Sequence, residues 1–243
     1  MAARHKEKQM NSVKRSVLFL GTFWLVLLTF MVTALAHDLP QGFVYVDDYI
    51  PDVVVELRYL THDNFLGEPV DGYVSARPIL TRQAAQALKG VQENLKPFGL
   101  GLKIFDAYRP QRAVDHFVRW AKDLSDTKMK AKYYPDVDKK DLFREGYIAD
   151  QSSHSRGSTV DLTLVDRASG TEVKELNMGS GFDFFGPLSW PTNLSIDASA
   201  RAHRMLLQRL MMDHGFEPYA QEWWHFTLKD EPYPDTYFDF PVR

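Results

Sequence analysis

The densest group of chemically capable residues is the segment SSHSRGSTVD, from Ser152 to Asp161. His154 precedes an alternating stretch in which Asp161 takes a polar position, so the two side chains can converge on one point. A second group, QEWWH, ends at His225 and adds the carboxylate of Glu222. Two imidazoles and one carboxylate suit catalytic zinc, which keeps a fourth position open for water. That water needs a neighbouring base, and Glu222 is the candidate.

Other interpretations of these residues stay open. A histidine among serines commonly forms hydrogen bonds within its loop, and a strand aspartate commonly meets backbone or an arginine. The helical zinc-protease motif HExxH is absent. In a regular strand Glu222 and His225 would point to opposite faces, so a metal site requires a bend or turn there. A serine nucleophile is disfavoured because Ser152, Ser153 and Ser155 lie outside any Gly-x-Ser-x-Gly motif.

Arg109 is the other unusual residue, because it stands between Tyr108 and Pro110 where a predicted strand gives way to a helix. A guanidinium held there can give paired hydrogen bonds to a carbonyl oxygen or a carboxylate. The simpler interpretation is an ion pair with Asp106, three residues earlier, and the sequence pattern alone favours it.

Hydrophobic periodicity predicts the elements that must position these residues. They are a helix over 83–96, a strand over 102–108, a helix over 110–124 with Pro110 in its first position, a strand over 159–165, a helix over 198–214 and a strand over 222–228. The polar stretch 126–150 is typical of a solvated loop. The apolar residues expected in the core from the helix over 198–214 are Ala202, Met205, Leu206, Leu210 and Met212. The mixed order of elements predicts an α+β domain, with a small, mostly antiparallel sheet and flanking helices.

Composition excludes several classes of protein. The chain has 243 residues, of which 44% are apolar and none is cysteine, so it forms a core without disulfides, thiolate metal sites or a catalytic thiol. Residues 1–36 hold five Lys or Arg and one Glu, which leaves 24 basic and 31 acidic residues, a net charge of −7, in 37–243. Such an acidic body argues against nucleic acid as a partner. Without repeats or linkers, residues 37–243 are expected to form one domain.

The N-terminal segment predicts export. An uncharged run over 17–36 follows the basic start and closes with Ala34-Leu35-Ala36, which describes a signal peptide cleaved before His37. The alternative is a retained membrane anchor, since about 20 apolar residues can span a bilayer. In either case the body lies outside the cytoplasm, periplasmic or secreted, and it meets a membrane only if the segment is retained.

Three motifs together resemble one family: DAYRP at 106–110, SSHSRGSTVDLTL at 152–164 and EWWH at 222–225. They are similar to the zinc D-alanyl-D-alanine dipeptidases, vancomycin-resistance-type members of a superfamily with D,D-carboxypeptidases and phage endolysins. Tyr59 with DNF at 63–65, VDGY at 70–73 and MGSGFD at 178–183 extend the likeness. Two features depart from the family. The stretch from His154 to Asp183 is longer than the family pattern, and this chain carries a predicted export signal, whereas the resistance enzyme acts in the cytoplasm.

The resemblance implies one zinc ion per chain as the cofactor, with His154, Asp161 and His225 as its ligands. It implies that Glu222 is the general base and acid. Arg109 would stabilise the oxygen that becomes negative in the tetrahedral intermediate.

The resemblance also assigns residues around the substrate. Asp106 would orient the arginine, and Tyr59, Ser152 and Asp183 match groups around the dipeptide, chiefly at its ammonium end. The implied activity is hydrolysis of the small dipeptide D-Ala-D-Ala to D-alanine outside the cytoplasm. The alternatives are a peptidoglycan D,D-carboxypeptidase or endopeptidase using the same site, and a non-enzymatic, zinc-stabilised wall-binding module, which would not need Glu222.

Overall fold

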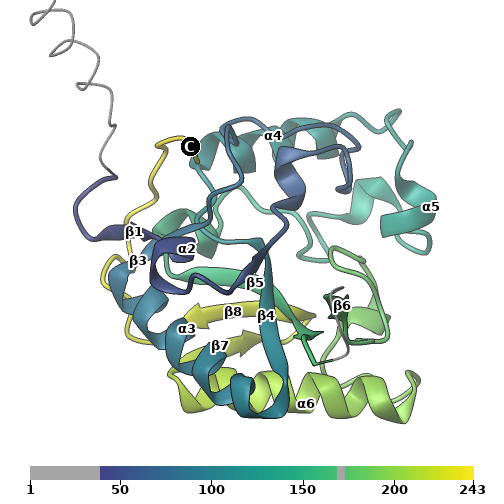
Figure 1. Cartoon of the computed structure of the whole chain (residues 1–243). Helices are drawn as coiled ribbons and strands as arrows, with labels where there is room; N and C mark the ends of the chain where they lie inside the picture. Colours follow the sequence, from purple (N-terminus) through teal and green to yellow (C-terminus); the bar gives the residue numbers. More distant parts are fainter. Residues whose placement is uncertain (1–38, 169–172) are drawn as a thin grey trace, which may run out of the picture. The chain divides into compact units, whose positions relative to one another are not determined.

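The computed structural model describes residues 39–168 and 173–243. All the elements below belong to one compact unit, Gly42–Arg243 (Figure 1). The predicted signal or anchor over 1–36 lies outside the described residues. Among the residues that are described, no helix combines the length and the apolar character needed to cross a membrane.

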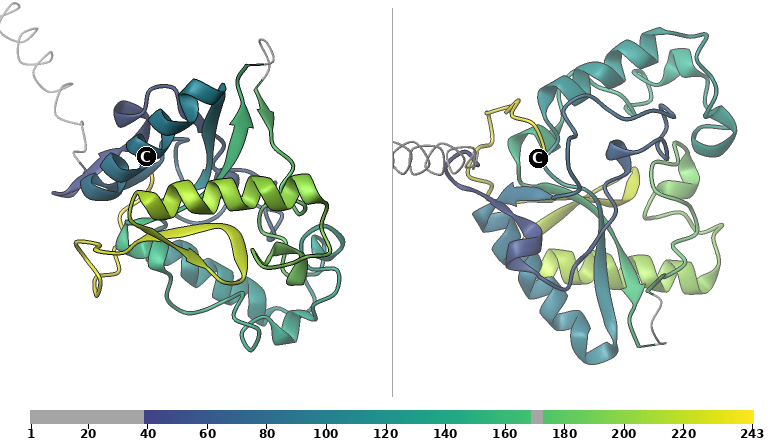
Figure 2. Two further views of the ribbon diagram at one scale, coloured as in Figure 1. Left: turned by 90° about the horizontal axis from the view of Figure 1, so that it is seen from below. Right: turned by 45° about the horizontal axis from the view of Figure 1, so that its top comes forward.

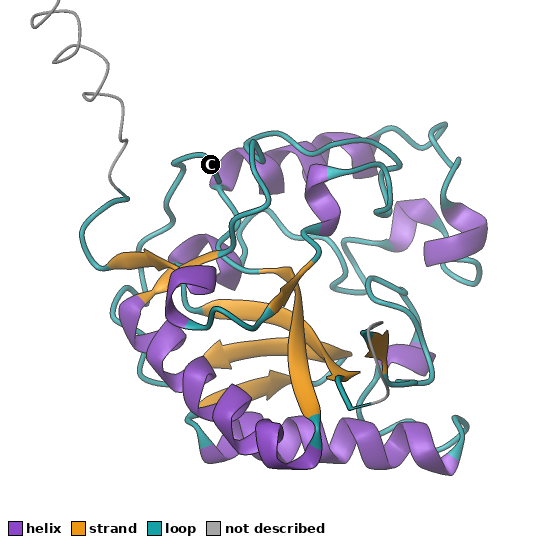
Figure 3. Ribbon diagram, viewed as in Figure 1, coloured by secondary structure: helices purple, strands orange, loops and turns teal. Residues whose placement is uncertain are grey.

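The main sheet is small and mostly antiparallel, as predicted (Figure 3). Its strand order is β2 (Val54–Val55), β4 (Leu100–Asp106), β5 (Thr159–Asp166), β8 (Glu222–Leu228) and β7 (Phe216–Tyr219), with β6 (Lys174–Glu175) paired to β5. Only β2 and β4 run parallel. A second sheet pairs β1 (Phe43–Tyr45) with β3 (Ile79–Thr81). The first seven residues of β5 are buried, so the central strand is covered on both faces.

Helices flank the main sheet (Figures 1 and 2). The α-helices are α2 (Val46–Tyr49), α3 (Arg82–Leu95), α4 (Gln111–Lys122), α5 (Lys130–Tyr133) and α6 (Ala198–Asp213). Short 3-10 turns are η2 (Arg58–Leu60), η3 (Lys96–Phe98), η4 (Lys139–Asp141), η5 (Ser153–Arg156) and η6 (Pro187–Ser189). α3 and α6 pack on the strands, whereas α4 and α5 lie on the opposite side of the sheet. The α+β class predicted from the sequence is confirmed.

Two predictions about the segments around α4 need correction. β4 ends at Asp106 and α4 begins at Gln111, so Pro110 is the extended residue before the helix and not its first residue. The stretch 126–150 is not simply a solvated loop, because it contains α5 and η4 and buries several side chains. Its aromatic residues explain this: the Tyr134 ring lies 5.6 Å from that of Trp120, on α4.

The predicted core face of α6 is wrong. Met205 is 70% exposed and Met212 is 50% exposed. The buried positions are Ala200, Arg204, Leu207 and Met211, which share one face at helical spacing. Apolar residues occur on both faces of this helix, so periodicity alone could not choose between them, and the buried face includes an arginine.

Candidate active site

Three neighbouring strands bring the first site residues together. Asp161 of β5 lies opposite His225 of β8 on one side and opposite Asp106 of β4 on the other. The pairing of β4 shifts by one residue between Ile104 and Asp106. A bulge of this kind re-aims a side chain, and here it puts Asp106, rather than Phe105, beside Asp161. Side chains of cross-strand partners share a face, so the three polar groups meet.

A second irregularity supplies the bend that the sequence required between Glu222 and His225. Pro218 of β7 pairs with Phe226, but the next residue, Tyr219, pairs with Glu222. Three residues of β8, between Glu222 and Phe226, therefore have no partner in β7. Glu222 Oε2 consequently lies 3.5 Å from His225 Nδ1, on the same side of the sheet.

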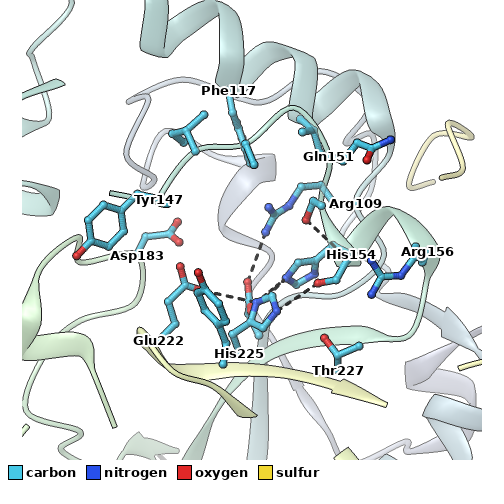
Figure 4. Close-up of a pocket in the computed structure, with 18 of the residues that line it drawn as sticks. Arg109, Phe117, Tyr147, Gln151, His154, Arg156, Asp183, Glu222, His225 and Thr227 are labelled. Atoms are coloured by element: carbon cyan, nitrogen blue, oxygen red, sulfur yellow. Dashed lines mark hydrogen bonds and ion pairs between the residues drawn. The ribbon is translucent and has the colours of Figure 1, made fainter. Parts of the chain in front are cut away.

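His154, Asp161 and His225 form a compact donor triad (Figure 4). Asp161 Oδ1 lies 3.2 Å from His154 Nε2 and 3.1 Å from His225 Nδ1, and the two nitrogens are 3.3 Å apart. Ligand atoms around a tetrahedral ion with bonds of about 2.0–2.2 Å lie about 3.3 Å apart. Asp161 Oδ1 is also buried without a hydrogen-bond donor, which is costly for a carboxylate unless a cation lies beside it. The triad therefore fits a small tetrahedral metal ion.

Neighbouring groups orient both imidazoles. His154 Nδ1 lies 2.6 Å from the carbonyl oxygen of Ala107, which assigns the proton to Nδ1 and leaves the Nε2 lone pair facing the triad. On the other ring, Nε2 of His225 lies 3.3 Å from Ser153 Oγ. Burial lowers the pKa of His154, so this ring is neutral, as a ligand must be.

Arg109 forms the ion pair with Asp106 that the sequence pattern favoured, and it also lies close to the triad. Its Nε and Nη2 atoms each lie 2.8 Å from Asp106 Oδ2, so the expected ion pair is present. Nη2 also lies 3.5 Å from Asp161 Oδ2, and the guanidinium lines the pocket beside the triad. Tyr73 donates a 2.6 Å hydrogen bond to Asp106 Oδ1. Tyr73 belongs to one of the family-like motifs, but its role could not be read from the sequence.

The far wall of the pocket carries a second buried carboxylate. The pocket has a volume of about 540 Å³, and Asp183 lines it with only 5% exposure. The Tyr59 hydroxyl donates to Asp183, at 2.9 Å to Oδ2. Burial raises the pKa of Asp183 well above its usual range, although Arg109 acts in the opposite direction. Among the described residues, no basic side chain forms an ion pair with this carboxyl. Its backbone is left-handed, with φ of 59°, and no other non-glycine residue in the described ranges has positive φ. Such strain clusters at functional sites.

Glu222 stands between the triad and Asp183 (Figure 4). Burial raises the pKa of its carboxyl to about 7, although His225 acts in the opposite direction. Ser152 lines the pocket as well, but its hydroxyl accepts a 3.3 Å hydrogen bond from the His154 backbone and so caps η5.

Part of the pocket wall was not predicted. Tyr147 and its neighbours come from the stretch expected to be a solvated loop, and the Tyr147 ring stacks 5.0 Å from that of Phe185. Tyr219 of β7 lies with its ring 5.5 Å from the His225 ring. The sequence signal that could have revealed this part of the wall was the presence of aromatic residues within an otherwise polar segment. Of the nine predicted site residues, Asp106 alone lies behind the pocket; the lining residues are Tyr59, Arg109, Ser152, His154, Asp161, Asp183, Glu222 and His225.

Comparisons with known proteins agree with this geometry. The family model described as D-ala-D-ala dipeptidase matches residues 40–243. The D-alanyl-D-alanine dipeptidase of Streptomyces coelicolor is 44% identical over 200 residues, which is 82% of this chain and 98% of that protein. The enzyme of the same name from Enterococcus faecalis is 46% identical over 202 residues, 83% of this chain and 98% of that protein.

The likeness to solved structures is weaker. A vancomycin-resistance D,D-pentapeptidase solved with Zn(II) matches 65% of this chain and 76% of its own, at 13% identity and a TM-score of 0.38. The match of the family model over nearly the whole described body, together with the two close relatives, confirms the resemblance seen in the sequence motifs. The chain belongs to the D-Ala-D-Ala dipeptidase family of metallopeptidases.

Proposed function

We propose that this protein is a zinc dipeptidase that hydrolyses D-Ala-D-Ala to D-alanine. The observation that carries the proposal is one pocket with a triad that can hold a metal ion on one wall and, on the other, the buried Asp183, which forms no ion pair with any described residue. A dipeptide zwitterion can place its ammonium at Asp183 while its peptide bond lies at the triad.

The donor set favours zinc as the metal. Two neutral imidazoles and one carboxylate are the ligands that catalytic zinc sites use, and they leave a net charge of about +1. When bound, zinc supplies the Lewis acidity that activates water and polarises the peptide carbonyl. His154, Asp161 and His225 would hold the ion.

Glu222 has the position and acidity of a proton carrier. Its carboxylate lies beside His225 and faces the pocket, so it can take a proton from the attacking water and deliver it to the leaving amine. A pKa near 7 suits both transfers, because the group then gains and loses a proton at similar cost.

Arg109 is placed to stabilise negative charge on the former carbonyl oxygen. The ion pair with Asp106 fixes the guanidinium plane, while its side chain lines the pocket beside the triad. Donors held rigidly in a water-poor site stabilise developing charge without having to reorganise. The bond to Asp106 is therefore a support for this role rather than an alternative to it.

The Asp183 end of the pocket favours a dipeptide over a longer peptide. A buried carboxylate is stabilised by a cation, and the free ammonium of a dipeptide supplies one. In a muropeptide the corresponding nitrogen belongs to an uncharged amide. Asp183 would then be left without a cation, and the rest of the peptide would have to fit against a buried wall. This difference counts against the carboxypeptidase and endopeptidase alternatives.

The test is hydrolysis by the purified protein of D-Ala-D-Ala, L-Ala-L-Ala and a muropeptide ending in D-Ala-D-Ala. We expect D-alanine from the free D,D-dipeptide alone, no product after chelation, and recovery with added zinc. Equal release from the muropeptide would support the D,D-carboxypeptidase alternative. No hydrolysis of any substrate by the zinc-loaded protein would support the wall-binding module.

We also propose that the protein acts outside the cytoplasm. The support is the basic start, the apolar run over 17–36 and the Ala-x-Ala before His37. Fractionation of expressing cells, followed by N-terminal sequencing, should find the protein in the periplasm or medium with His37 first. An intact N-terminus in the membrane fraction would indicate a retained anchor, and a cytoplasmic protein would contradict export.

A further inference from the structure

Arg204 is a buried cation that forms no ion pair within the described part of the chain. It lies on the packed face of α6, and only 3% of its surface is exposed. No carboxylate among the described residues forms an ion pair with it, and burial alone lowers its pKa to about 10. Buried arginines are rare unless they are paired, so this one requires another source of stabilisation.

The guanidinium of Arg204 is instead bonded to one loop. Its Nε donates to the carbonyl of Met178 at 2.6 Å, and its Nη1 donates to that of Trp190 at 2.9 Å. Its Nη2 donates to the carbonyl of Leu188 at 2.8 Å and to Ser180 Oγ at 3.3 Å. These acceptors come from both ends of the stretch 178–190, so a single side chain ties the loop to α6.

The loop that Arg204 ties down is the one that carries Asp183. Asp183 lies between the bonded positions and holds a left-handed backbone conformation. Such a conformation persists only where its surroundings impose it. Ser180 Oγ also accepts a 3.0 Å hydrogen bond from Trp223, the neighbour of Glu222 in β8. The network thus connects the Asp183 loop to the strand that carries the proposed base.

We propose that Arg204 is a positioning residue for the ammonium site. It holds the loop 178–190 in the conformation that presents the Asp183 carboxylate to the pocket, and it thereby sets the preference for substrates with a free N-terminus. This inference rests on the proposed function, in which Asp183 receives the substrate ammonium. The planar guanidinium directs several donors outward at fixed angles, so a lysine at this position cannot make the same set of bonds.

The test compares Arg204→Lys with wild type on D-Ala-D-Ala and on N-acetyl-D-Ala-D-Ala. We expect kcat/KM for the free dipeptide to fall about tenfold to a hundredfold, mostly through KM, because a small displacement of a positioning group has effects of this size. The much slower hydrolysis of the acetylated substrate, which offers no ammonium to Asp183, should change little. The matched control is Arg201→Lys, because Arg201 is also on α6 and bonds backbone carbonyls, but of Leu194 and Ile196.

A double variant separates positioning from general stability. If Arg204 acts through Asp183, then adding Arg204→Lys to Asp183→Asn should not lower the preference for the free dipeptide further. Ser180→Ala, which removes one acceptor, should shift the preference in the same direction by less and guards against misfolding of the lysine variant. Rates are referred to folded protein measured by near-UV circular dichroism.

Two outcomes would overturn the inference at different levels. A lower melting temperature in Arg204→Lys, with the substrate preference unchanged as in Arg201→Lys, would leave Arg204 a purely structural role. A wild-type enzyme that does not prefer the free dipeptide over the acetylated one would overturn the ammonium site itself, before any variant is made.

Discussion

Glu222 and His225 lie three residues apart in β8, yet their side chains reach the same side of the sheet, with Oε2 3.5 Å from Nδ1. A regular strand would put them on opposite faces. The shift in pairing between β7 and β8 removes this conflict, because three residues of β8 have no partner there. Bulges beside active sites commonly re-aim side chains in this way. Here the bulge puts the proposed proton acceptor next to a proposed metal ligand.

Glu222→Gln should leave zinc content, folding and affinity for D-Ala-D-Ala unchanged and slow the chemical step. The amide is nearly isosteric but cannot accept the proton, and proton transfer of this kind contributes about 10²–10⁴-fold. Zinc content, dipeptide binding and the single-turnover rate are measured on the same preparation. Full zinc and normal binding with only a tenfold slower rate would remove Glu222 from the mechanism.

Purified wild-type protein should contain one zinc per chain, and His154→Ala and His225→Ala should each lose it. The two nitrogens lie 3.3 Å apart at the triad, so removal of either leaves only two donors. Elemental analysis gives the metal content. His116→Ala is the matched control, because His116 pairs with Glu68 away from the triad. Full occupancy in either triad variant would contradict the ligand assignment.

Arg109→Ala should lower kcat by about 10²–10³-fold, with a smaller change in KM, because its donors meet full negative charge only in the transition state. Lysine should rescue poorly, since it lacks the planar fork that bonds Asp106 through both Nε and Nη2. Steady-state kinetics and thermal unfolding of both variants check this. Loss of stability with normal activity per folded molecule would limit Arg109 to its ion pair.

Tyr73→Phe should reduce kcat while zinc content stays at the wild-type level. Its hydroxyl donates to Asp106 Oδ1 at 2.6 Å, and Asp106 in turn holds Arg109, so the loss loosens the guanidinium. In an Arg109→Ala background the same change should have no further effect on kcat. Tyr134→Phe, another buried tyrosine, is the control. Additive effects of Tyr73→Phe and Arg109→Ala would show that Tyr73 acts independently.

The sequence predicted the site residues better than it predicted their arrangement. His154, Asp161, Glu222 and His225 could be chosen as candidates because metal ligation and proton transfer each require particular residue types in short motifs. Their convergence depends on strand register and on two bulges, which are set by pairing with β4 and β7. No local pattern encodes such pairings. The sequence therefore indicates that a bend is needed at Glu222, whereas the pairing that produces the bend is visible only in the fold.

The helices show the same difference between what the local sequence predicts and what depends on tertiary contacts. Helices α3 and α4 follow clear apolar stripes and lie within two residues of the predicted ranges. α6 has apolar residues around much of its surface, and its buried face includes Arg204, whose bonds go to a loop earlier in the chain. A buried arginine resembles a surface residue in the sequence until its carbonyl partners are known.

The N-cap of α6 gives a pH-dependent prediction. Asp197 Oδ1 accepts hydrogen bonds from the Ala200 backbone at 2.8 Å and from Ser199 Oγ at 2.6 Å, and Oδ2 accepts one from Asn177 at 2.8 Å. The Ser199 bond is the chief reason that the pKa of Asp197 falls to about 2. The folded state therefore binds this proton more weakly than the unfolded chain, whose pKa is about 3.9. The stabilisation is fully present above pH 4 and is lost as the pH falls towards 2.

Asp197→Ala should accordingly lower the melting temperature at pH 7, and its difference from wild type should shrink between about pH 4 and pH 2. Asp197→Asn keeps a capping oxygen but does not titrate in this range, so its difference from Asp197→Ala should stay nearly constant with pH. Thermal unfolding of the three proteins across this range measures both differences. A gap between wild type and Asp197→Ala that does not change with pH would show that the charge of Asp197 contributes nothing to the start of α6, the helix that carries Arg204.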